Sequence, residues 1–177
     1  MNDFIWKVDK QHASIEFAVS HMVIAEVIGL IKNFDITIKT TKADFSDSKV
    51  EVHLDANSIF TNVEARDKHL MSADFLDAEN FPEIRFMSNN FHKIAEKKFE
   101  MQGRLTIRDI TLTTTVEVEH TGIQKDPWGH IKAGFKAKAT IRRTAFGLTW
   151  NTILDNGAWL VGNDIKVSFQ GEFIREN

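Results

Sequence analysis

The stretch "HIKAGFKAKATIR", residues 130–142, decides the fold class because apolar and polar side chains alternate along its whole length. Successive residues of a β-strand point to opposite faces of the sheet, so one face of this strand is apolar and the other is largely basic. Such half-buried strands are typical of antiparallel sheets. The small residues Ala133, Gly134, Ala137 and Ala139 also indicate room beside this strand for something other than protein.

The same alternation recurs along most of the chain and predicts about eight strands. These strands cover residues 13–19, 27–39, 49–56, 83–88, 99–107, 113–120, 130–142 and 164–174. Turn-forming segments separate them, and neither a linker, a repeat nor a shift in composition divides the chain. Residues 1–177 are therefore expected to form a single all-β domain. A sheet of this size closes as a barrel or packs as a sandwich, and the pattern fits both.

Composition excludes several classes of function. The net charge of −3 is spread evenly, so no nucleic-acid partner is expected. No apolar run approaches the roughly 20 residues of a membrane-spanning helix. The absence of cysteine excludes disulfides, thiolate metal sites and thiol nucleophiles. Fourteen phenylalanines without a single tyrosine indicate aromatic surface that is hidden from water and needs no hydroxyl.

The amino-terminal residues lack the apolar core of a secretory signal, so the protein as printed is expected in the cytoplasm. A periplasmic location is expected if an export signal has been removed from the printed sequence.

One helix is predicted over residues 62–71. Thr61 and Glu64 have the T-x-x-E spacing of a capping box, in which two side chains satisfy the first amides of a helix. Glu64 and Lys68 then stand four residues apart, in the favourable order for an ion pair.

The run "ARDKHL", residues 65–70, is the one concentrated group of polar residues that could support chemistry. His69 could act as a base with Asp67 as its partner, but residues two apart on a helix point in different directions. Arg66 lies in line with the apolar Leu70, which favours a structural tether to a carboxylate or to backbone carbonyls. The structural interpretation is therefore preferred.

No other catalytic or metal-binding motif is recognisable. The seven histidines are spread along the chain without metal-ligand spacing. The G-x-S-x-G elbow of serine hydrolases and both glycine-rich phosphate-binding motifs are missing. The expectation is no metal, no catalytic cofactor and no catalytic residue.

Five segments together resemble one known family. They are "WKVDKQHASIEFAVSHM" (6–22), "SIFTNVEARDKHLMSADFLDAENFPEIRFMS" (58–88), "GRLTIRDIT" (103–111), "RRTAFGLTWN" (142–151) and "LVGNDIKV" (160–167). In this order they resemble the YceI-like, lipocalin-like polyisoprenoid-binding proteins along nearly the whole chain. Ile31 and Asp109 depart from the family pattern, where phenylalanine and glycine are usual.

The resemblance implies a single antiparallel eight-stranded lipocalin-like β-barrel, capped by the short helix around residues 62–71. Its apolar tunnel would bind an isoprenoid lipid, either a quinone tail or a polyprenyl alcohol or phosphate, for carriage, storage or shielding. Transient membrane contact and a homodimer formed by edge pairing are further expectations. The alternatives are an enzyme acting on such lipids, with His69, His21 or Asp67 in acid–base roles, and a sandwich with a filled core.

The ligand-binding residues that follow from this resemblance are mostly the inward apolar side chains of the predicted strands. They are Phe17, Val19, His21, Met22, Phe34, Ile36, Ile38, Val52, Leu54, Leu70, Phe75, Phe86, Leu105, Val116, Val118, Phe135, Ala137, Phe146, Trp150, Val167 and Phe169.

Overall fold

The computed structural model describes residues 3–176, and most of its regular structure is β-strand. The strands of this range are β1 (Phe4–His21), β2 (Ala25–Ile31), β3 (Phe34–Thr40), β4 (Lys49–Asp55), β5 (Ile59–Phe60), β6 (Glu83–Ala95), β7 (Lys98–Ile107), β8 (Ile110–Lys125), β9 (Ile131–Arg142) and β10 (Val161–Arg175). The helices are α1 (Glu64–Met71) and two short 3₁₀ turns, η1 (Ala56–Ser58) and η2 (Arg143–Phe146).

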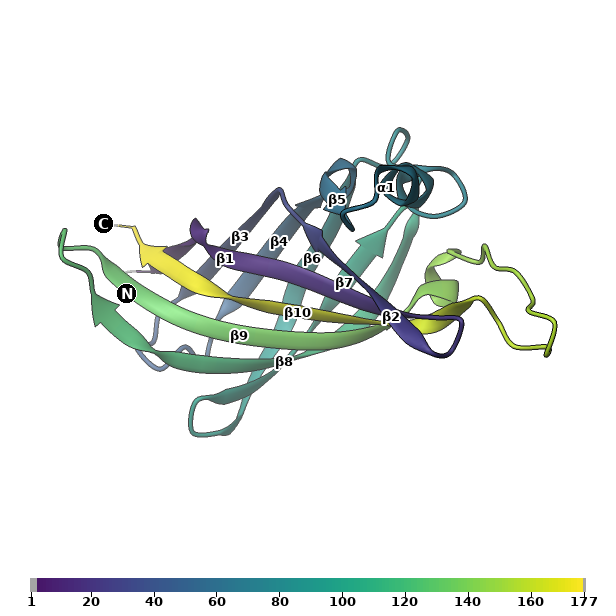
Figure 1. Ribbon diagram of the computed structural model, residues 1–177. Coiled ribbons are helices and arrows are strands. Elements are labelled where there is room, and N and C mark those ends of the chain that lie inside the picture. Colours follow the sequence, from purple (N-terminus) through teal and green to yellow (C-terminus); the bar gives the residue numbers. More distant parts are fainter. Residues whose placement is uncertain (1–2, 177) are drawn as a thin grey trace.

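The strands form one antiparallel sheet that closes on itself, because β10 pairs with β1 as well as with β9. β1, β3, β4 and β6 to β10 make the ring, while β2 and β5 extend it beside the second half of β1. Figure 1 shows β1 and β10 side by side along the barrel wall. The closed eight-stranded barrel with one short helix confirms the predicted fold class, and the sandwich alternative is wrong.

The predicted strand over residues 27–39 is two strands, β2 and β3, which are separated at Lys32 and Asn33. β1 is long enough to pair with both, first with β3 and then with β2. The break shifts the inward-facing positions by one residue, so that Ile31 lines the interior before it and Ile36 after it. A change of this kind moves every later side chain to the other face, which continuous alternation does not allow.

One end of the barrel, the closed end, is filled by Phe45. This residue lies in the turn that joins β3 to β4, and only 1% of it is exposed. Its ring centroid lies 5.3 Å from that of Trp6 and 5.0 Å from that of Phe135, in a T-shaped contact with Phe135. Rings packed in this way are favoured beyond the area that they bury, so they seal this end of the interior.

Asp47 holds the same turn in shape. Its carboxylate accepts hydrogen bonds from the hydroxyls of Thr40 and Thr41, each at 2.5 Å. These bonds hold the pKa of Asp47 well below its usual range. Local side-chain bonds of this kind stabilise a turn that would otherwise expose unpaired amides, and they fix Phe45 above the interior.

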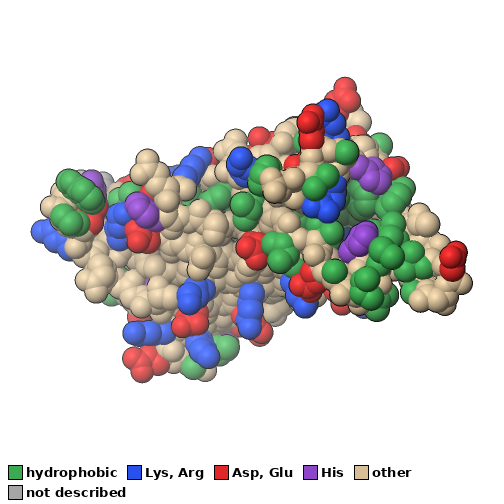
Figure 2. All heavy atoms as spheres, in the orientation of Figure 1, with side chains coloured by type: hydrophobic (Ala, Val, Ile, Leu, Met, Phe, Trp, Pro, Cys, Tyr) green, Lys and Arg blue, Asp and Glu red, His purple; other side chains and the backbone are tan. Residues whose placement is uncertain are grey.

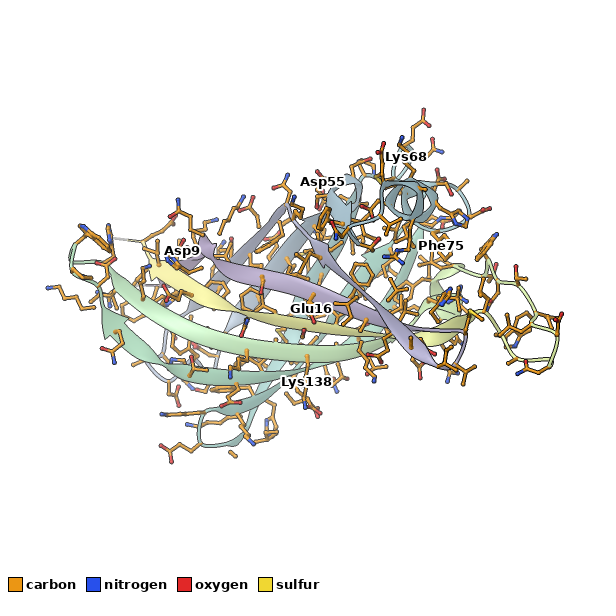
Figure 3. The ribbon with its side chains drawn as sticks, viewed as in Figure 1. Asp9, Glu16, Asp55, Lys68, Phe75 and Lys138 are labelled. Carbon is orange, nitrogen blue, oxygen red and sulfur yellow. The ribbon has the colours of Figure 1, made fainter. Side chains whose placement is uncertain are left out.

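The opposite end, the mouth, is covered by α1 and flanked by the β1–β2 turn and by the loop of residues 147–160. Figure 1 shows these three segments together at one end, and both termini at the other. Figure 3 shows Lys68 on the outer side of α1 and Phe75 beneath the helix, toward the barrel. The helix thus lies over an opening.

Candidate ligand-binding cavity

A cavity of about 440 Å³ lies inside the barrel and extends toward the mouth. All but eight of its lining residues are apolar, because the inward positions of the strands are those that the alternation leaves apolar. The volume is within the range of sites that hold small molecules, roughly 300 to 1,000 Å³.

Most of the residues predicted to bind a ligand line this cavity. Of the predicted set, only Met22, Phe34 and Phe146 do not, and all of these residues lie in the described part of the chain. Placement on the cavity wall is a structural finding, and contact with a bound ligand stays a prediction. The agreement arises because the direction of a strand side chain follows from residue parity once one inward residue is known.

The three exceptions each have a local cause. Met22 lies in the β1–β2 turn and is exposed, because the strand has already ended at His21. Phe34 begins β3 beside Leu54 and is buried in the packed core instead of bordering the cavity. Phe146 ends η2, whose turn places the ring in the core beside β8. These three residues do not line the cavity, and their contact with a ligand stays a prediction.

Three aromatic rings meet at the mouth beneath α1. The ring of His69 packs edge-on against Phe75 at 5.0 Å and against Trp150 at 4.7 Å between centroids. Phe75 and Trp150 lie 5.4 Å apart. All three residues line the cavity, and their rings are called here the aromatic lid.

The hydrogen bonds of α1 differ from those predicted. Val63 is the N-cap and makes no side-chain cap bond, so the predicted capping box is wrong. Instead, the backbone amide and hydroxyl of Thr61 both donate to Asp67 Oδ1, at 2.8 and 2.6 Å. Arg66 Nε and Nη2 in turn donate to the hydroxyl and carbonyl of Thr61, at 2.7 and 2.9 Å. Arg66 is a tether, as predicted, but it holds the segment before its own helix.

This arrangement also separates Asp67 from His69. The carboxylate that pairs with His69 is Asp74, whose Oδ2 lies 2.8 Å from Nε2. His69 and Asp67 are therefore not paired, as the helix geometry predicts, and Asp67 binds the Thr61 segment instead. The predicted ion pair between Glu64 and Lys68 is confirmed, with a separation of 2.7 Å.

Arg143 is the cavity residue that sequence reasoning missed most completely. It is buried, and its guanidinium donates to four backbone carbonyls, those of Leu148, Trp150, Val161 and Gly162, at 2.6 to 3.2 Å. Burial lowers the pKa of Arg143, but a guanidinium remains charged. The residue fixes the 147–160 loop to β10, and its position within the "RRTAFGLTWN" segment was the available signal.

The barrel wall is incomplete toward the mouth. β8 and β9 pair from Lys125 and Ile131 at the closed end as far as Glu117 and Lys138. Beyond that point the described part of β8 pairs with β7 and that of β9 pairs with β10. Thr114 and Lys138, two of the few polar residues that line the cavity, lie where the two strands separate.

The residues that line the cavity favour holding an apolar molecule over carrying out a reaction. Among residues 3–176, no aspartate or glutamate lines it. The hydroxyl of Ser48, which does, donates to the carbonyl of Phe45 at 2.7 Å. The basic residues Arg66, His69 and Arg143 gather at the mouth. Apolar surface with polar groups at one end suits a hydrocarbon with a polar head.

A second polar cluster lies near the closed end and could be mistaken for a metal site. Oxygen and nitrogen ligand atoms of Asp9, His12 and Glu172 lie within 4.8 Å of one another. The ammonium of Lys132 already bridges Asp9 and Glu172, at 2.8 and 2.9 Å. Burial alone raises the pKa of Asp9, but hydrogen bonds from Lys132 and His12 outweigh it and hold the pKa at about 2. The cluster joins β1, β9 and β10 as ion pairs (Asp9 in Figure 3).

No helix among residues 3–176 has both the length and the apolar character needed to cross a membrane.

Comparison with known proteins places this barrel among related chains. A family model described as a YceI-like domain matches residues 6–173. A UPF0312 protein of Pseudomonas savastanoi pv. phaseolicola is 34% identical over 169 residues, which are 96% of this chain and 85% of that relative. The crystal structure of a Campylobacter jejuni YceI protein gives a TM-score of 0.76 at 27% identity and covers 89% of this chain and 90% of the other.

A more distant structure is described as a polyisoprenoid binding domain from Saccharophagus degradans. It gives a TM-score of 0.66 at 10% identity and covers 97% of this chain and 98% of the other. At that identity the likeness shows the fold alone.

Proposed function

The chain belongs to the YceI-like domain family, and from that premise we propose that its barrel binds the chain of one isoprenoid lipid. The lipid would be a quinone or a polyprenyl alcohol or phosphate, which the protein carries, stores or shields from water. The observation that carries the proposal is the cavity itself, apolar along the barrel and polar at the mouth.

The physical argument concerns what such a cavity favours. A prenyl chain has no hydrogen-bonding groups, so an apolar wall leaves nothing unsatisfied. Each methylene that leaves water contributes about 0.8 kcal/mol. Phenylalanine fits this wall where tyrosine would not, since a buried hydroxyl would lack a partner. A domain described as polyisoprenoid-binding shares the fold, which supports the same assignment.

The polar head group of the lipid would lie at the mouth. Arg66 and His69 line the cavity there, beside the aromatic lid. The prenyl tail would then run along the barrel toward the closed end, where Phe135 and Phe173 line the wall. On this model the protein binds its ligand and needs no reaction.

The test is the identity of the lipid that the purified protein releases. Organic extraction followed by mass spectrometry is expected to yield a prenyl lipid, chemically unchanged. Added polyprenol or isoprenoid quinone is expected to raise the melting temperature of delipidated protein more than a linear fatty alcohol of equal length does. A lipid-free protein whose stability ignores both prenyl compounds would contradict the proposal.

A cavity-filling variant tests whether the lipid lies within the barrel. Ala137 lines the cavity between Val118 and Phe169 on the neighbouring strands. Ala137→Trp is expected to reduce bound prenyl lipid at least about tenfold, because the indole takes the space of the chain. Lys136→Trp is the matched control, since the adjacent side chain is exposed and points outward. Equal lipid content in the two variants would show that the lipid lies elsewhere.

A further inference from the structure

We propose that the mouth of the barrel docks on the surface of a neutral lipid bilayer through an exposed apolar rim. The rim consists of Met22, Val23 and Ile24 in the β1–β2 turn and of Ile153 and Trp159 in the 147–160 loop. This inference rests on the proposed function, because it identifies the surface from which the cavity would take up its lipid.

All five rim side chains are exposed although they are large and apolar. Ile24 is 83% exposed and Trp159 is 57% exposed, and the other three are also exposed. Figure 2 shows hydrophobic side chains gathered at the end of the barrel where Figure 1 places α1, the β1–β2 turn and the 147–160 loop. Contiguous apolar surface of this kind on a folded protein marks an interaction site.

The backbone holds these side chains outward. Met22 and Val23 have φ angles of 54° and 66°, in the left-handed region that a β-branched residue rarely adopts. The amide of Met22 donates to the carbonyl of Leu160 at 2.7 Å and so ties this strained turn to the second loop. Strain that is maintained at a loop tip is typical of functional surfaces.

Hydrogen bonds within the second loop bring its two rim residues together. Ile153 and Trp159 face each other across an isolated antiparallel bridge, and the amide of Leu160 donates to the carbonyl of Thr152 at 2.8 Å. The next residues along the chain, Leu160 and Val161, line the cavity. The rim is therefore continuous with the cavity wall, as the β1–β2 turn is through His21.

The distribution of charge identifies the partner as neutral. Residues 22–25 carry no charged side chain, and residues 149–160 carry only Asp155. An anionic membrane or a nucleic acid would be matched by lysine and arginine, which the rim lacks. Apolar side chains with a tryptophan and without basic residues match the interfacial region of a neutral bilayer.

Docking in this way gives a hydrocarbon chain a path that avoids water. The rim would sit in the interfacial region, and the cavity behind it would open toward the acyl chains. The aromatic lid and α1 lie on this path. A lipid would then move between two apolar environments instead of exposing its chain to solvent.

The experiment is flotation of purified protein with phosphatidylcholine vesicles that contain no prenyl lipid. The wild-type protein is expected to float with the vesicles, and its binding is expected to change by less than about twofold between about 0.05 and 0.5 M NaCl. The double variant Ile24→Glu with Trp159→Glu is expected to bind at least about tenfold more weakly, since two carboxylates replace apolar side chains at the interface.

The matched control is Ile94→Glu with Trp128→Glu. These residues are 58% and 80% exposed and lie away from the mouth, at the β6–β7 and β8–β9 ends of the strands. The control is expected to bind vesicles as the wild type does, with both double variants retaining the wild-type melting temperature. Equal loss in the two double variants, or binding that needs anionic lipid and disappears in high salt, would overturn the proposal.

Light scattering tests the other candidate occupant of the rim, a second copy of this chain. A wild-type dimer that the rim variant converts to a monomer, together with no vesicle binding, would overturn membrane docking.

Loading of detergent-solubilised prenyl lipid separates this proposal from the proposed function. A rim variant that loads lipid from detergent but has lost vesicle binding supports docking, whereas a wild type that binds vesicles but never loads lipid contradicts the proposed function alone.

Discussion

The two ends of the barrel are closed in different ways. At the closed end, Phe45 from the β3–β4 turn is almost fully buried against Trp6 and Phe135. At the mouth, the cover is the separate helix α1, none of whose eight residues, all of them described, is buried. The first closure is part of the packed core, and the second lies on the surface of the molecule.

This difference indicates which end can open. Removing Phe45 would disrupt a core packed like a solid, which is costly. Moving α1 would uncover no fully buried residue of the helix itself, and regions with few buried contacts open at low free energy. A ligand is therefore expected to enter at the mouth, beside the apolar rim.

The largest predicted effect is at the closed end. Phe45→Ala is expected to lower the free energy of unfolding by about 3–5 kcal/mol, because it leaves a cavity among well-packed rings. Denaturant unfolding measures this loss. Trp128→Ala, at an exposed aromatic residue of the β8–β9 turn, is the control and is expected to cost less than about 0.5 kcal/mol. A cost below about 1 kcal/mol for Phe45→Ala would mean that the two ends do not differ as described.

A somewhat smaller effect is expected at the part of the mouth that is rigid. Arg143→Lys is expected to lower the free energy of unfolding by about 2–3 kcal/mol, since an ammonium cannot reproduce four hydrogen bonds to separate carbonyls. Arg142→Lys is the adjacent control, because that side chain is exposed. If both changes have the same effect, Arg143 does not hold the 147–160 loop. That loop would then be no more firmly attached to the barrel than α1.

Ligand release is the next effect. Trp150→Ala is expected to increase the rate at which a fluorescent prenyl probe leaves the protein by about tenfold, because it removes one ring of the aromatic lid. Stopped-flow fluorescence measures this rate. His69→Phe keeps an aromatic ring in place and is expected to leave release slow. An unchanged rate in Trp150→Ala would place the exit elsewhere, for instance where β8 and β9 separate.

The smallest effect concerns pH at the closed end. The pKa of Asp9 is about 2 in the folded protein, against an ordinary value of 3.8. A lowered pKa stabilises the folded state at pH values above the ordinary one, and this contribution is lost as pH falls toward 2. Its size is about 1 kcal/mol for this partly screened carboxylate.

Asp9→Asn is therefore expected to flatten the decline in melting temperature between about pH 4 and pH 2. Asp35→Asn, at an exposed carboxylate paired with Lys10 at 3.1 Å, is the control and is expected to keep the wild-type decline. If the melting temperature falls equally with pH in the wild type and both variants, Asp9 does not contribute to the pH dependence of stability.

Local patterns account for the parts of the fold and cavity that could be predicted. Along β9, alternation places Phe135 and Ala137 on the wall and Lys136 outside, because residue parity fixes side-chain direction within a strand. This alternation of inward and outward side chains is interrupted at Asn33, where β2 has ended and β3 has not yet begun. It also fails at Met22, where a strand ends before the pattern does.

Other features depended on contacts between distant residues. The T-x-x-E spacing at Thr61 fits a capping box. The hydroxyl of Thr61 instead makes hydrogen bonds with Asp67 and Arg66, because the helix packs against the segment that precedes it. Arg143 resembles its exposed neighbour Arg142 in sequence, and only the convergence of the 147–160 loop with β10 gives it four carbonyl partners.

The sequence by itself determined the family, the class of fold and the apolar character of the interior. Strand periodicity and sequence motifs involve residues that are close together in the chain, so they can be recognised without the structure. Only the tertiary structure decided that Phe45 closes one end, that Asp74 pairs with His69, and that two loops form an exposed rim. Each of these depends on which distant segments meet when the sheet closes between β1 and β10, and no local pattern encodes that meeting.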